Sequence, residues 1–124
     1  MSVVAKYTLL IGCLSALLGV IFGAFGAHFL KTRIDEYSLS IFEVGVRYQF
    51  YHAFALILYA FFLQSTGSED RGPTIAFTLG TLIFSGSLYA LAFTGIKILG
   101  AITPIGGVAF IVGWVLWMMK TFKL

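Results

Sequence analysis

Charged side chains are scarce in this chain. Only 10% of its 124 residues are Asp, Glu, Lys or Arg, whereas 60% are hydrophobic. A water-soluble domain of this size could not hide so many apolar side chains, because small domains bury only about two thirds of the surface that their unfolded chains expose. The composition therefore excludes an ordinary soluble domain and predicts an integral membrane protein whose remaining apolar surface is covered by lipid.

Cysteine and concentrated positive charge are also lacking. The single cysteine, Cys13, excludes an internal disulfide bond. The net charge of +3 comes from 8 Lys and Arg against 5 Asp and Glu, which are scattered between apolar runs rather than clustered. Nucleic-acid binding is therefore not expected.

Catalytic motifs are missing as well. The sequence contains no GxSxG, HExxH, GxGxxG or CxxC pattern, so the usual signatures of a nucleophile with its base, a metal site or a cofactor loop are absent. We predict a non-enzyme without a cofactor or metal. Ion-coupled export is disfavoured too, because the acidic residues fall outside the apolar runs or at their edges, whereas coupled transporters carry acidic side chains in the membrane.

What the chain does contain is four uncharged runs, at 7–30, 48–68, 72–96 and 98–119. Each exceeds the roughly 20 residues that a helix needs to cross about 30 Å of hydrocarbon. The first run continues to Leu30, long enough to span, so we expect a retained helix rather than a cleaved signal. The prediction is an all-α, integral membrane four-helix bundle, a single domain over 1–124 with spans near 7–30, 48–66, 73–95 and 103–120.

Pro104 complicates the fourth run, because proline is disfavoured deep inside a helix. A helix that begins with Thr103 as its N-cap and Pro104 at its first position would remove the conflict. Residues 95–103 would then form a loop at the membrane interface.

Small residues recur every four positions in these runs, a pattern that lets helices approach closely. The predicted helix-packing residues are Ser15, Gly19, Gly23 and Ala27 in the first run, Gly86 and Ala90 in the third, and Gly113 in the fourth. They can serve packing within one bundle or contact with a second copy of the chain.

Between the first two runs the chain carries two opposed stripes. Apolar residues and charged residues each recur at spacings of three and four over 34–47. This pattern predicts a short amphipathic helix lying flat at the interface. Glu43 and Arg47 are spaced for an intrahelical ion pair on it. The segment can be a simple connection or the roof of a binding site.

Both histidines lie near this connection. With spans bounded by charge, His28 and His52 reach similar depth near one face of the membrane, and the predicted polar cluster consists of His28, Glu43, Arg47, Tyr48, Gln49 and His52. Ionisable groups at membrane depth are candidates for function. Three roles stay open: a structural hydrogen bond to a backbone carbonyl, tyrosine or water; proton or ligand handling; and metal or haem ligation.

Positively charged residues do not orient the chain, because each side of a four-span arrangement receives four of them. Discounting Arg47 as paired with Glu43 favours cytoplasmic termini. With an even number of spans, both termini share a side.

Five short motifs carry a resemblance. GAFGAH at 23–28, YQFYHA at 48–53, FSGSLY at 84–89, TPIGG at 103–107 and Gly113-Trp114 follow one another in this order. The chain resembles the YgdD/YwdK-like family of small four-span membrane proteins. The resemblance implies a cell inner membrane protein of uncharacterised function, and it supplies no reaction, cofactor or catalytic residue.

Two functions compete on this basis. The first is a non-enzymatic accessory or structural bundle that packs with itself or with a larger membrane complex. The second is a lipid- or quinone-binding module that uses the polar cluster near His28 and His52. The expected partners are membrane lipid, and a second copy of the chain or a larger complex.

Overall fold

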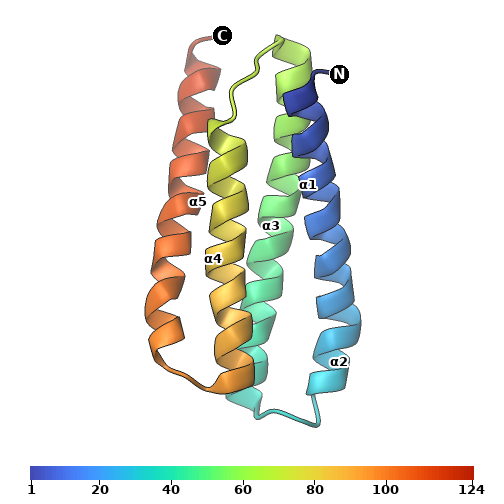
Figure 1. Ribbon diagram of the computed structural model, residues 1–124, viewed down its shortest axis with the longest axis vertical. Helices are drawn as coiled ribbons and strands as arrows, with labels where there is room; N and C mark the ends of the chain where they lie inside the picture. Colours follow the sequence, from blue (N-terminus) through green and yellow to red (C-terminus); the bar gives the residue numbers. More distant parts are fainter.

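The computed structural model describes residues 1–124 as four long antiparallel helical rods joined by short connections (Figure 1). Helix α1 (Val3–Val20) continues through a π-helical segment, η1 (Ile21–Gly26), into α2 (Ala27–Leu30). The other rods are α3 (Glu36–Thr66), α4 (Gly72–Thr94) and α5 (Ile98–Phe122). No strand is present, so the predicted all-α bundle is confirmed.

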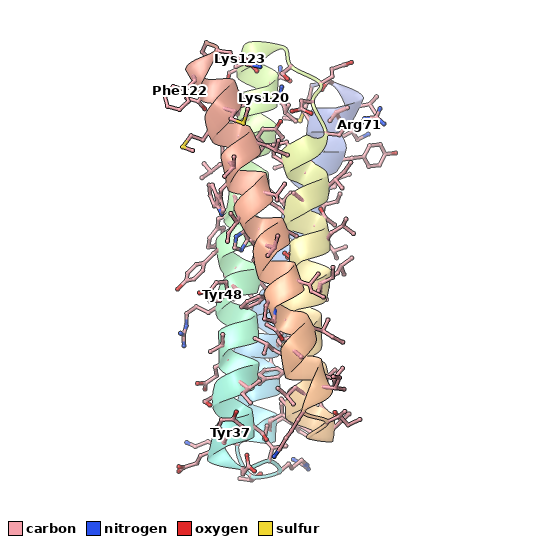
Figure 2. All side chains as sticks on the ribbon, turned by 90° about the vertical axis from the view of Figure 1, so that its left-hand side faces the viewer. Tyr37, Tyr48, Arg71, Lys120, Phe122 and Lys123 are labelled. Atoms are coloured by element: carbon pink, nitrogen blue, oxygen red, sulfur yellow. The ribbon has the colours of Figure 1, made fainter.

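Each of the four rods is long and apolar enough to cross a membrane. The outward side chains of the bundle are largely hydrocarbon, as Figure 2 illustrates. The two termini lie at the same end of the bundle (Figure 1), as an even number of spans requires. The chain is a multi-pass membrane protein, as the sequence predicts.

The order of packing is α1 on α3, α3 on α4 and α4 on α5. Small residues set the closest approaches between α4 and α5. A Cβ atom on Gly106 would lie 2.7 Å from Phe84 Cα, and one on Gly113 would lie 2.6 Å from Phe77 Cε1. Real carbon atoms need about 3.5–4.0 Å, so glycine is required at both positions.

The small residues of the first rod are used within the bundle. A Cβ atom on Gly19 would lie 3.0 Å from the Phe50 ring of α3, and one on Gly23 would lie 3.1 Å from Val46. Ala27 packs against the core cluster that contains Val46. Gly86 of α4 is different, because nothing lies within 4 Å of its would-be Cβ, and Ala90 one turn later is half-buried.

The prediction of a separate interfacial helix at 34–47 is wrong, because residues 36–47 form the first part of α3. Asp35 caps this helix: its carboxylate accepts a 2.7 Å hydrogen bond from the Ser38 backbone N–H, which lowers the pKa of Asp35. No proline interrupts the chain between this cap and the end of α3, so the amphipathic stretch runs directly into the apolar one. Charge marked where the apolar run begins, whereas the cap marks where the helix begins.

The predicted start of the fourth helix is also wrong. Helix α5 begins at Ile98 and contains Pro104 in its interior, so 95–103 is not a loop. Thr103 is not an N-cap, since its hydroxyl lies 2.6 Å from the Ser87 hydroxyl of α4 and 3.3 Å from the Leu99 carbonyl. Neighbouring helices and hydroxyl side chains make proline tolerable in such helices.

Candidate functional site

The six residues of the predicted polar cluster do not come together. His28 is exposed on α2, near the end of the bundle. Its neighbour Gly26 packs against Phe42, and His52 lies ten residues further along α3, about 15 Å away along the axis. The prediction of a site shared by His28 and His52 is therefore wrong. The span boundaries drawn from charge placed the start of α3 too late, which put His52 too close to the membrane face.

His52 is buried in mid-bundle with both ring nitrogens engaged. Its exposed fraction is 4%, and its ring stacks on Phe110 with 3.5 Å between centroids. Trp114 Nε1–H donates to His52 Nε2 at 3.1 Å. An indole nitrogen can only donate, so Nδ1 carries the proton and donates to the Tyr48 carbonyl at 2.8 Å. The imidazole is thus neutral and has no free lone pair for a metal or a haem iron.

Gln49 points toward α1 and α4 and joins three helices. Its Nε2 donates to the Ser15 carbonyl of α1 at 2.8 Å, and its Oε1 accepts from the Tyr89 hydroxyl of α4 at 2.6 Å. Only this amide orientation works, because the Ser15 carbonyl cannot donate. Gln49 is 4% exposed, so its side chain ties α1 and α4 together through α3.

Beside this network lies a crevice of about 410 Å³ between α1 and α4, with α3 as its floor. Its mouth is formed by Leu14, Leu18 and Leu82, whose side chains are exposed on the outer surface of the bundle. The crevice therefore opens sideways toward lipid. Its volume falls within the range of roughly 300–1,000 Å³ typical of small-molecule sites.

The accessible surface of the crevice is almost entirely apolar, and polar but uncharged residues lie just beneath it. Besides Gln49 of α3 and Tyr89 of α4, these residues include Ser85 of α4, whose hydroxyl donates to the Gly45 carbonyl at 2.6 Å. Ser15 Oγ is the exception, because it is buried and has no hydrogen-bond partner. A buried hydroxyl without a partner costs roughly 1–3 kcal/mol, so this group would gain from a ligand that moves the covering side chains aside.

The π-helical segment η1 forms one end of this crevice. The Ala27 N–H bonds to the Phe22 carbonyl five residues earlier, the pattern of a π-turn, which is frequent at functional sites. Phe22 meets Tyr89 edge to face at 5.3 Å. Both rings also line a second cavity of about 200 Å³ nearer the α1–α3 connection, so this aromatic pair separates two hollows along one groove.

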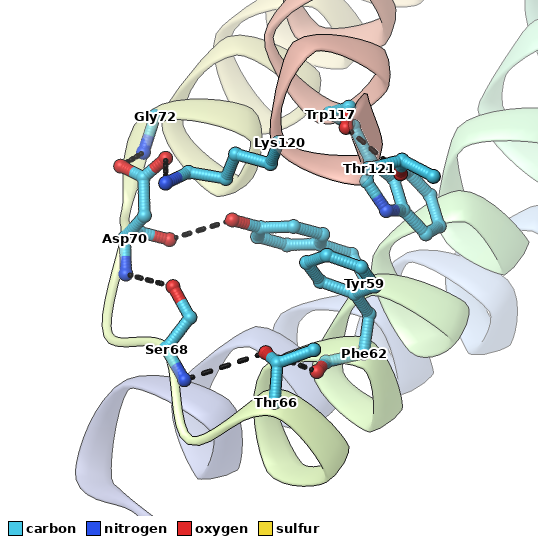
Figure 3. A network of polar contacts seen from close by, with 9 residues as sticks. All are labelled: Tyr59, Phe62, Thr66, Ser68, Asp70, Gly72, Trp117, Lys120 and Thr121. Carbon is cyan, nitrogen blue, oxygen red and sulfur yellow. Dashed lines mark hydrogen bonds and ion pairs between the residues drawn. The ribbon is translucent and has the colours of Figure 1, made fainter. Parts of the chain in front are cut away.

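The opposite end of the bundle holds a polar latch (Figure 3). Asp70, in the connection between α3 and α4, lies 2.9 Å from Lys120 Nζ of α5. Its carboxylate also accepts from the Gly72 N–H at 2.9 Å, and its carbonyl accepts from the Tyr59 hydroxyl at 2.9 Å. Partial burial acts to raise the pKa of Asp70, but the Gly72 hydrogen bond and the Lys120 ammonium outweigh it, so the pKa is lowered. The latch fastens the connection to α5.

Sequence reasoning missed both the crevice and the unpartnered hydroxyl of Ser15. Gln49 was grouped with His52 because they are three residues apart, yet the two side chains point to different helices. A glutamine well inside an apolar run was a signal for an interhelical contact. The π-turn had no signal in the spacing of apolar residues.

Comparisons with known proteins agree on one family. The family described as "Protein of unknown function (DUF423)" matches residues 22–107. A UPF0382 membrane protein of Staphylococcus aureus (strain bovine RF122 / ET3-1) is 42% identical over 118 residues, which cover 95% of this chain and 97% of that protein. The UPF0382 membrane protein YwdK of Bacillus subtilis (strain 168) is 44% identical over 121 residues, covering 95% and 98%. No solved structure matches the chain.

Proposed function

Because the chain belongs to the DUF423 family, whose relatives here are bacterial membrane proteins, we propose that it is a non-enzymatic module that binds a neutral membrane amphiphile in the crevice between α1 and α4. Membership of this family confirms the resemblance drawn from the five motifs. The crevice also changes the order of the two functions considered above. We favour amphiphile binding over simple packing, and we propose a site at Ser15, Gln49 and Tyr89 in place of the histidines.

The observation that carries this proposal is the unpartnered Ser15 hydroxyl, which lies just beneath the surface of a crevice open to lipid. A ligand carbonyl that accepts a hydrogen bond from this hydroxyl would remove the cost of leaving it unpaired. The apolar wall suits a hydrocarbon chain or ring. The ligand thus combines one polar group with a large apolar part.

We propose a quinone, and not a phospholipid, as this ligand. The crevice carries no charged side chain, so it offers nothing to neutralise a phosphate group. Gln49 adjoins Tyr48, whose ring lies 4.5 Å from that of Phe84 in the middle of α4, and this depth is far from where lipid head groups lie. A quinone ring with an isoprenoid tail carries neutral carbonyls at that depth. Binding involves no chemical step.

Thermal unfolding in nanodiscs tests this function, with a naphthoquinone that carries one isoprenoid unit as the probe. A ligand that binds only the folded protein raises stability by about 2.7 kcal/mol at a hundredfold excess over its Kd. Ser15→Leu should abolish this gain by filling the crevice. Ser15→Ala should weaken binding about tenfold through the lost hydrogen bond. Ser65→Leu, at an exposed serine on the last turn of α3, is the matched control.

Two results would contradict the proposal. One is an unfolding temperature of the wild type that does not respond to the quinone. The other is a response that survives in Ser15→Leu, which would place the binding elsewhere. A response to added phosphatidylglycerol instead of the quinone would exclude the neutral ligand.

We propose two further properties, association through α3 and cytoplasmic termini. Charged side chains on the outer face of α3 favour association with a further membrane chain. The termini are proposed to be cytoplasmic, and reporter fusions at both ends test this.

A further inference from the structure

The outer face of α3 carries polar residues where lipid would otherwise touch the bundle. Glu36, Ser40, Glu43 and Arg47 follow one another at spacings of four, three and four, and all four are exposed. We call these four residues the α3 polar face. They point away from the neighbouring helices. Beyond Arg47 the same face becomes apolar, with exposed Tyr51, Phe54 and Leu58.

The upper end of this face lies deep in the membrane. The ring of Tyr48, next to Arg47, lies 4.5 Å from that of Phe84 and 6.4 Å from that of Phe110. These residues occupy the middle of α4 (Gly72–Thr94) and of α5 (Ile98–Phe122), and Figure 2 shows Tyr48 near the middle of the bundle's length. Charged groups at such depth normally face the bundle interior and pair with one another.

Neither charge has a partner within the chain. The one ion pair of the chain joins Lys120 to Asp70 at the opposite end. Glu43 and Arg47 have the spacing for an intrahelical pair, yet they form none, so the pair predicted from the sequence is wrong. Two opposite charges, one turn apart, are therefore both exposed on the surface that faces lipid.

We propose that the α3 polar face is the interface with a second copy of the chain, in which Arg47 of each copy pairs with Glu43 of the other. An interface with two-fold symmetry must be self-complementary, so that each contact occurs twice. One acid and one base a single turn apart on a helix meet this requirement. Both charges are then neutralised without any additional protein.

The two copies lie parallel. The face is polar from Glu36 to Arg47 and apolar from Tyr51 onward, so only a parallel pair matches polar with polar and apolar with apolar. An antiparallel pair would place Glu36 against the apolar half of its partner. This interface lies on the far side of α3 from Gln49, which faces α1 and α4, and it does not depend on ligand binding.

A charge-swap experiment tests the interface directly. Arg47→Glu places acids at both 43 and 47, and Glu43→Arg places bases at both, so each variant alone repels its own copy. We expect each single variant to lose about tenfold or more in dimer affinity, as close charge pairs at interfaces do. The two variants expressed together, and the double variant Glu43→Arg with Arg47→Glu, should both recover the wild-type dimer. Recovery also shows that the variant chains fold.

Cysteine cross-linking in native membranes fixes the arrangement. In a Cys13→Ser background, Ser40→Cys should form a disulfide-linked dimer, because the parallel arrangement brings Ser40 close to its copy. Leu82→Cys on the exposed surface of α4 is the control and should remain monomeric. A monomeric wild type, a cross-link from Ser40→Cys to a different protein, or a double swap that stays monomeric would each overturn the proposal.

Discussion

Replacing Gly106 by alanine should loosen the packing of α5 on α4. A Cβ atom at this position would lie 2.7 Å from both Cα and Cβ of Phe84. The backbone of Phe84 cannot turn aside as a flexible side chain can, so the two helices must separate by about 1 Å to restore normal contact.

The loss of stability that we expect follows from this separation of the two helices. Overpacking of a close contact costs typically about 1–3 kcal/mol. The helical preference of alanine over glycine returns up to about 1 kcal/mol. Because the clash is with backbone, and because Gly80 and Gly113 share the same interface with Phe110 and Phe77, we expect a net loss of about 2 kcal/mol in the free energy of unfolding.

Gly86→Ala is the matched control, since nothing lies within 4 Å of its would-be Cβ. Equilibrium unfolding of both variants in lipid bicelles measures the difference. Gly86→Ala should match or exceed the wild-type stability, whereas Gly106→Ala should fall below it. Equal stabilities for the two variants would refute the close helix contact on which this reasoning rests.

Three further outcomes are expected. Gly19→Leu should destabilise the bundle by pushing the Phe50 ring away from α1, and wild-type unfolding of this variant would mean that the small residues of α1 do not set its packing on α3. His28→Ala and His52→Ala should have additive effects on stability, because sites without shared partners do not couple; a coupling above about 0.5 kcal/mol in a double-mutant cycle would restore a shared site. The pKa of Asp70 is lowered in the folded protein. The carboxylate therefore contributes fully to the stability of the fold above its unfolded pKa of about 3.9, and this contribution is lost as pH falls through the lower pKa of the folded state. The stability difference between wild type and Asp70→Asn should therefore shrink in acid, and a difference that stays constant down to the lowest pH would exclude the latch.

The fold could be predicted because its cause is composition. Long apolar runs cross the membrane. In lipid, a crossing segment must form its backbone hydrogen bonds internally, as a helix does. Helix boundaries were harder, because charge marks where lipid ends and not where a helix begins. The cap at Asp35 decided one boundary. Pro104 lies inside α5, since neighbouring helices and hydroxyl side chains make proline tolerable in such helices.

The candidate site could not be predicted in the same way. Which side of α3 each polar residue faces depends on where α1, α4 and α5 pack. Spacing placed Gln49 and His52 together, whereas packing sends Gln49 to Ser15 and Tyr89, and His52 to Trp114. A crevice is a property of three helices at once, so no single stretch of sequence contains it.

A density map of the protein extracted from native membranes into nanodiscs would test the central claim most directly. We expect density for a flat ring between α1 and α4, with a polar atom within hydrogen-bond distance of Ser15 Oγ. A closed crevice, with α1 against α4 and the Ser15 hydroxyl bonded to a carbonyl of its own helix, would contradict the claim that the crevice binds a ligand.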